Sequence, residues 1–238
     1  MYENVDRAIE SLRRGEFILI YDFDNREGET DFVIASGRVT DSAIRTMRKD
    51  GGGLICTCVP YSFWKKIDMP YMVDIYRSIW DRYPLLKYME ANDIPYDAKS
   101  SFSITINHRK SFTGITDRDR ALTISEFARV IEYAGTHEQN EILSLLEKNF
   151  RTPGHVSLLN GSNDLLNQRR GHTELSLFMM YAAGLLPSST ICEMMGDDGY
   201  SLSKKEAMKY AEEHNIPYLT GNEILMYKER LKSANITV

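Results

Sequence analysis

The 238-residue sequence has few cysteines and no long apolar run. Its three cysteines are Cys56, Cys58 and Cys192, an odd number without a Cys-x-x-Cys pair. This pattern supports neither a disulfide framework nor a zinc ribbon, and we expect a reducing, cytoplasmic setting. The N-terminal stretch 1–16 is charged throughout, unlike a signal or transit peptide. No apolar stretch approaches the roughly 20 residues needed to cross a bilayer, so we expect no membrane partner.

Basic residues are also fewer than acidic residues. Lys and Arg number 29 against 34 Asp and Glu, a formal charge of −5. An acidic chain is a poor candidate for nucleic-acid binding, so we expect no such partner. A few local arginines can still bind phosphate, whatever the total charge.

Hydrophobic residues make up 42% of the chain, enough for a substantial core. Without repeats or linkers, the sequence predicts one catalytic domain over 1–232 and a frayed tail over 233–238. Helical and strand patterns alternate, which predicts an α/β (mixed α+β) fold with a mixed sheet covered by helices. The stretch 61–97 is rich in aromatic residues and has no clear period. Strands are expected at 17–21, 32–36, 54–59, 102–107, 155–159 and 189–193, and helices near 5–14, 40–50, 120–134, 138–149, 172–185, 203–214 and from 220 onward.

An acidic loop connects the first two expected strands. The stretch 22–31, DFDNREGETD, holds five carboxylates and one arginine. Glu27, Glu29 and Asp31 alternate, so an extended backbone would turn all three to one side, and Gly28 lets the backbone bend toward a ligand. Converging carboxylates suit a hard cation such as magnesium, or a general base. A solvated polar hairpin is the alternative interpretation.

A second polar motif, RRGHTE over 169–174, precedes an apolar helix. Free backbone N–H groups, the helix dipole and the guanidinium groups of Arg169 and Arg170 together favour an anion such as phosphate. His172 could bind a metal or move a proton. An ordinary helix start with solvated side chains is the alternative.

Three further polar residues stand at strand ends or turns. His155 begins an apolar strand, Glu193 ends a short buried one, and Thr113 lies in a Gly-containing turn. Each also has a purely structural interpretation: a hydrogen-bonded histidine, a carboxylate that reaches solvent, and a simple turn.

Taken together and in order, these motifs resemble the 3,4-dihydroxy-2-butanone 4-phosphate synthase family, and archaeal members most closely. The matching segments span about residues 15–219. They are 22–31, 53–56, 112–116 with 119–121, 151–156, 170–174, and 191–193 with 197–199.

The resemblance implies a homodimer that converts ribulose 5-phosphate to 3,4-dihydroxy-2-butanone 4-phosphate and formate. It implies a Mg²⁺ or Mn²⁺ cofactor, with possibly two ions per site, held by Glu27 and His172. By the same resemblance, the catalytic residues are Glu29, Asp31, His155 and Glu193, and the substrate-binding residues are Arg26, Glu27, Asp31, Thr113, Arg169, Arg170, Gly171, His172 and Thr173.

Two other functions use the same groups. A metal-dependent phosphatase would release inorganic phosphate instead of formate. A sugar-phosphate sensor would bind ligand without turnover, although the side chains proposed for catalysis are all present.

Overall fold

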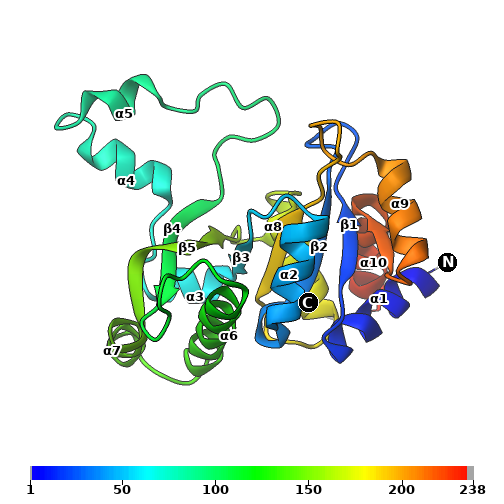
Figure 1. The fold of residues 1–238 in the computed structure, drawn as a ribbon, viewed down its shortest axis with the longest axis horizontal. Coiled ribbons are helices and arrows are strands. Elements are labelled where there is room, and N and C mark those ends of the chain that lie inside the picture. Colours follow the sequence, from blue (N-terminus) through cyan, green and yellow to red (C-terminus); the bar gives the residue numbers. More distant parts are fainter. Residues whose placement is uncertain (1, 235–238) are drawn as a thin grey trace.

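Seven strands form one mixed sheet with helices on both faces in the computed structural model, which describes residues 2–234 (Figure 1). The strand order is β4-β5-β3-β6-β2-β1-β7. Pairs β1–β2, β2–β6, β3–β6 and β4–β5 are antiparallel, whereas β1–β7 and β3–β5 are parallel. The predicted α/β class with a mixed sheet is therefore confirmed.

Helices and strands are interspersed along the chain. The strands are β1 (Ile18–Tyr21), β2 (Thr30–Ala35), β3 (Cys56–Val59), β4 (Phe102–His108), β5 (Phe150–Asn160), β6 (Ser189–Glu193) and β7 (Tyr218–Thr220). The α-helices are α1 (Glu3–Arg14), α2 (Asp41–Asp50), α3 (Tyr61–Lys66), α4 (Met72–Ile79), α5 (Pro84–Tyr88), α6 (Asp117–Tyr133), α7 (Gln139–Asn149), α8 (His172–Ala182), α9 (Lys204–Glu213) and α10 (Gly221–Ser233), and the short 3-10 helices are η1 (Ser36–Arg38) and η2 (Leu165–Asn167).

Two apolar cores lie on opposite faces of the sheet because strand side chains alternate. Phe32 and Ile34 of β2 face a core shared with α2, α3, α6, α7 and α9. Val33 and Ala35 face the other core, which α1, α8 and α10 cover. Helix α8 is buried along most of its length, in keeping with its apolar sequence. Within residues 2–234, no helix is both long and apolar enough to span a membrane.

Local signals placed most element ends correctly. Gly15 ends α1 in the left-handed conformation, at φ 77°. The Thr40 hydroxyl accepts a hydrogen bond from the Ala43 N–H and so begins α2, and Thr220 and Glu223 form the expected capping box of α10. The three-residue strand β7 was not predicted, because it is too short to show a period.

The unassigned stretch after residue 60 forms three short helices. Of these, α3 packs on the core through Phe63, whereas every residue of α4 and α5 is at least partly exposed. Helices α4 and α5 stand away from the rest of the molecule at the upper left of Figure 1, and a long loop returns from them to β4. At the other end, α10 continues through Ser233, and residues 235–238 of the predicted tail lie outside the described residues.

Replacing Gly154 with alanine tests a close approach of backbones within the sheet. A Cβ at Gly154 would lie 2.0 Å from the carbonyl carbon of Ile106 on the neighbouring β4. We expect Gly154→Ala to lower the free energy of unfolding by about 1–3 kcal/mol, because β4 and β5 must separate to admit the methyl group. Urea unfolding measures the loss.

Gly37→Ala is the matched control, because a Cβ there meets nothing within 4 Å. Equal losses in the two variants would contradict the packing argument.

Candidate active site

The acidic loop between β1 and β2 is folded around the carboxylate of Asp22. Its Oδ1 accepts hydrogen bonds from the backbone N–H groups of Gly28 and Glu29, at 2.9 and 3.1 Å. Its Oδ2 accepts from the N–H of Glu27 at 3.1 Å and from Arg26 Nη1 at 3.2 Å. Asp22 is 1% exposed, so these contacts replace its hydration. The loop is thus a fixed structure and not a solvated hairpin.

The fold of this loop turns three of the carboxylates that follow Asp22 toward one cavity. Gly28 takes a positive φ of 68°, which a residue with a side chain adopts at a cost. On its two sides Glu27 and Glu29 line the cavity, and Asp31 follows from β2. The alternation in the sequence therefore predicted their convergence correctly.

His172, the first residue of α8, meets the acidic loop directly. Its Nδ1 lies 3.1 Å from Glu27 Oε2, and its Nε2 lies 3.2 Å from the Glu29 carbonyl oxygen and 3.5 Å from Asp31 Oδ1. Burial of the ring disfavours its charged form, but the charge of Asp31 and the hydrogen bond to Glu27 outweigh burial and raise the pKa of His172 to about 9. Burial also opposes the charge of Glu27, yet His172 and Arg26 lower the pKa of Glu27 to about 2.

Three other carboxyl groups of the site, those of Glu29, Asp31 and Glu193, have raised pKa values. Asp31 and Glu193 are direct partners across the antiparallel pair β2–β6, so one strand register brings both to the cavity. Burial, and then neighbouring charges, raise the pKa of Asp31 well above its ordinary value, and burial likewise raises the pKa of Glu193. The pKa of Glu29 is raised by burial and by Glu27. Carboxyl groups tuned in this way can give and take protons near neutral pH.

Two guanidinium groups flank the start of α8. Arg26 contacts Glu27 Oε1 at 2.9 Å, and Arg169 Nη1 contacts Glu174 Oε2 at 2.7 Å. Both pack against Gly171, where an added Cβ would lie 2.3 Å from Arg169 Nη1 and 2.7 Å from Arg26 Nη2. This close approach explains the glycine at the helix start.

A cavity of about 340 Å³ joins these groups. This volume suits a small metabolite. Five carboxylates line it against one arginine and one histidine, so the site favours cations. The lining residues are Glu27, Glu29, Asp31, Leu54, Cys56, Ile94, Tyr96, Asp97, Ser100, Ser101, Phe102, Leu159, Arg169, His172, Thr173, Ile191 and Glu193.

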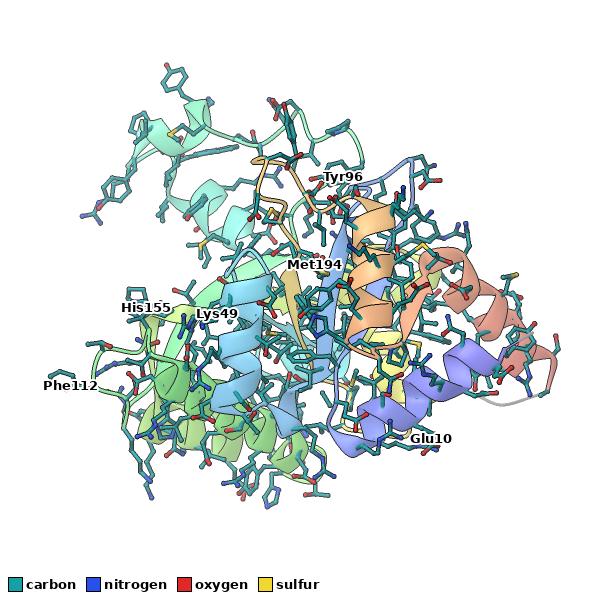
Figure 2. The ribbon with its side chains drawn as sticks, turned by 45° about the vertical axis from the view of Figure 1, so that its right-hand side comes forward. Glu10, Lys49, Tyr96, Phe112, His155 and Met194 are labelled. Atoms are coloured by element: carbon teal, nitrogen blue, oxygen red, sulfur yellow. The ribbon has the colours of Figure 1, made fainter. Side chains whose placement is uncertain are left out.

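Five predicted site residues do not line this cavity. Arg26 and Gly171 contact the lining residues Asp97 and Arg169, whereas the other three lie elsewhere. His155 is exposed, and its Nδ1 lies 3.0 Å from Asn107 Nδ2, which also reaches the Thr113 carbonyl oxygen at 3.5 Å. In Figure 2, His155 projects at the left-hand edge with the exposed Phe112, far from Tyr96 at the cavity. Arg170 is exposed and does not line the cavity. The fold therefore does not bring His155, Thr113 and Arg170 to the cavity of their own chain.

The chain's own groups fit a divalent cation. One ligand atom each from Asp22, Glu27 and His172 lie within 4.8 Å of one another. The 3.1 Å between His172 Nδ1 and Glu27 Oε2 matches the separation of roughly 3 Å between adjacent octahedral ligands of magnesium. Asp31 Oδ1 is buried without a hydrogen-bond partner among residues 2–234. A buried carboxylate oxygen without a hydrogen bond, whose charged neighbour is His172 Nε2 at 3.5 Å, is a group that a cation would stabilise.

Fold and site together define an α/β protein whose acidic cavity could hold a metal ion and carries the groups of an acid–base enzyme. The chain belongs to the 3,4-dihydroxy-2-butanone 4-phosphate synthase family, whose sequence model matches residues 6–227. It is 47% identical over 222 residues to the synthase of Methanothermobacter thermautotrophicus, covering 93% of this chain and 94% of that protein. It is 38% identical to the synthase of Archaeoglobus fulgidus, covering 100% and 99%. The archaeal resemblance is therefore confirmed.

Solved structures share the fold at lower identity. A cation-free 3,4-dihydroxy-2-butanone 4-phosphate synthase superposes with a TM-score of 0.74 at 23% identity, covering 96% of this chain and 98% of that one. Another structure with that name, in complex with two magnesium ions, gives 0.73 at 22% identity, covering 96% and 97%.

Sequence reasoning missed two residues of the site. Asp22 was noted only as part of a charged loop, although an aspartate directly after a strand is a common acceptor for turn N–H groups. Asp97, which contacts both Arg26 and Arg169, lies in the stretch without a period, and no local signal marks it.

Replacing Asp22 with asparagine tests whether one carboxylate holds the loop. The amide would turn an N–H toward backbone N–H donors, so we expect Asp22→Asn to lower the free energy of unfolding by about 1–3 kcal/mol and to weaken magnesium binding. Urea unfolding and calorimetric titration measure the two effects.

Asp24→Asn makes the same charge change in the same loop, at a side chain that is 81% exposed. We expect a loss below about 1 kcal/mol there. If the two variants behave alike, Asp22 has no special role.

Proposed function

We propose that this protein converts ribulose 5-phosphate to 3,4-dihydroxy-2-butanone 4-phosphate and formate, a step in riboflavin biosynthesis. The observation that carries the proposal is the contact of His172 with Glu27 inside a cavity that Arg169 also lines. The family match and the archaeal relatives with the synthase name support the same reaction. The three free cysteines are all buried, which fits a reducing cytoplasm.

Magnesium or manganese is the cofactor we propose, held by Glu27 and His172. Bound there, a divalent ion would polarise the oxygens of the substrate and stabilise developing negative charge. The structural neighbour with two magnesium ions supports this choice, and a second ion per site is part of the proposal.

The phosphate group of the substrate would bind at the positive end of α8, between Arg26, Arg169, Gly171 and Thr173.

The carboxyl groups would move the protons. Asp31 or Glu29 would remove the C3 proton of the sugar, since both line the cavity with raised pKa values. Loss of the C1 hydroxyl as water, a carbon shift, hydration and release of C4 as formate follow. The water lost is regained, so the five-carbon phosphate divides into the four-carbon product and formic acid. Glu193 would serve the later proton transfers.

A homodimer is the assembly that we propose. By the family resemblance His155 matches a position essential for catalysis and Thr113 matches a phosphate contact, but neither lines the cavity of its own chain. Phe112, the residue before Thr113, is 94% exposed. Such an apolar surface is one that a second copy of the chain would cover. A second copy could supply His155 and Thr113 to the cavity of the first.

Turnover is the first prediction of this proposal. Purified protein with ribulose 5-phosphate and magnesium should release one formate per sugar phosphate consumed, and excess EDTA should stop the reaction. Coupled formate dehydrogenase and a phosphate assay follow the two possible products. Release of inorganic phosphate without formate would indicate a phosphatase, and binding without any product would indicate a sensor.

The metal assignment has its own variants. We expect Glu27→Gln and His172→Ala to reduce turnover by a factor of about 100 or more while folding normally. Near-normal turnover in either variant would contradict the assignment of that residue as a metal ligand.

Mixing two inactive variants tests the shared site. If His155 acts across the dimer, co-expressed His155→Ala and Glu193→Gln chains should recover about a quarter of normal activity, because half of the dimers then hold one intact site of two. Co-expressed His172→Ala and Glu193→Gln chains should recover nothing, since both residues lie in one cavity. No recovery in the first mixture, with mixed dimers verified by mass spectrometry, would refute the shared site.

A further inference from the structure

The loop that returns from α5 forms one wall of the cavity. Here we call residues 89–101 the strap. Its members Ile94, Tyr96, Asp97, Ser100 and Ser101 line the cavity. The helices that precede it are exposed along their length, so the apolar core does little to hold the strap in place. Salt bridges from Glu90 to Arg77 and from Lys99 to Asp74 join the two ends of the strap to α4, and polar contacts at the cavity hold its middle.

Asp97 makes the main polar contacts of the strap. A single oxygen, Oδ2, lies 2.6 Å from both Nε and Nη2 of Arg169 and 3.0 Å from Nη2 of Arg26. The Asp97 side chain is 13% exposed and that of Arg26 is 8% exposed, so water screens these contacts little. The neighbouring Tyr96 ring lies 5.3 Å from the Arg26 guanidinium carbon and covers it further.

Each guanidinium group is also held from its opposite side. Glu174, fully buried, accepts from Arg169 Nη1 at 2.7 Å and from the Ser162 N–H at 3.0 Å. Asp22 and Glu27 accept from Arg26 Nη1. The two arginines come from distant parts of the chain, and among residues 2–234 Asp97 is the carboxylate that contacts both.

We propose that Asp97 is a positioning residue for phosphate recognition: it holds Arg26 and Arg169 together beside the start of α8. Two guanidinium groups at one place repel each other, and long side chains lose much rotational freedom when they are fixed. A carboxylate between them offsets the repulsion and fixes both geometries before the ligand arrives. This inference rests on the proposed function only for the identity of the phosphate ligand.

Two opposing effects follow from removing the charge of Asp97. Asp97 is one of five carboxylates around the cavity, so its loss would by itself favour an anion. Against this, the two arginines would lose three short charge-assisted contacts. The buried setting makes the second effect the larger one, and the net result is weaker phosphate binding.

Asp97→Asn tests the proposal in the full-length protein. We expect its affinity for inorganic phosphate, measured by calorimetry with excess magnesium, to fall by about tenfold. For ribulose 5-phosphate we expect KM to rise by about the same factor, while kcat stays within about threefold. Asp97→Glu, which keeps the charge, should recover part of the affinity.

Asp93→Asn is the matched control, with the same charge change at an exposed position of the strap. Its phosphate affinity should change by less than about twofold. Unchanged phosphate binding in Asp97→Asn would overturn the proposal, because Asp97 would then have no role in it. Tighter binding would also overturn it, because Asp97 would then compete with phosphate for the arginines. If the unmodified protein releases no formate while Asp97→Asn still weakens phosphate binding, the proposed reaction is rejected and the role of Asp97 in phosphate binding stands.

Discussion

The hydrogen bonding of one buried carboxylate underlies the whole site. Asp22 accepts the N–H groups of Glu27, Gly28 and Glu29, and so folds the acidic loop back on itself. Without these bonds, the repulsion between neighbouring carboxylates would extend the loop into solvent. With them, Glu27 is carried to His172, and the site acquires a pair of groups able to hold a cation.

The site is a balance of closely spaced opposite charges. Arg26 and Arg169 each contact carboxylates on two sides. In contrast, Asp31 Oδ1 has no hydrogen-bond partner among the described residues. A site of this kind stores repulsion that a bound cation relieves, so ion binding and protein stability should be linked. The raised pKa values of Asp31 and Glu193 have the same origin, since burial and like charge both disfavour ionisation.

The polar groups of the chain fall into two separate sets. The cavity set comes from the β1–β2 loop, the end of β6 and the start of α8, which meet at one end of the sheet. The other set, with His155 and Thr113, is held by Asn107 on the edge strand β4. This second set lies beside the exposed Phe112, away from the cavity of its own chain. In the proposed homodimer, it could contribute to the cavity of the other copy.

Short-range patterns by themselves determined most helices and strands, although not α3, α4, α5 or β7. They also determined the turn at Gly28 and the convergence of Glu27 with Glu29, because each depends on neighbours a few residues apart. They also marked His172 as the start of a helix. Only the tertiary structure decided that Asp31 faces Glu193, that Asp97 reaches Arg169, and that His155 lies away from the cavity. Such pairs join residues far apart in the chain, and their distances follow from strand register and loop path, which local propensity does not encode.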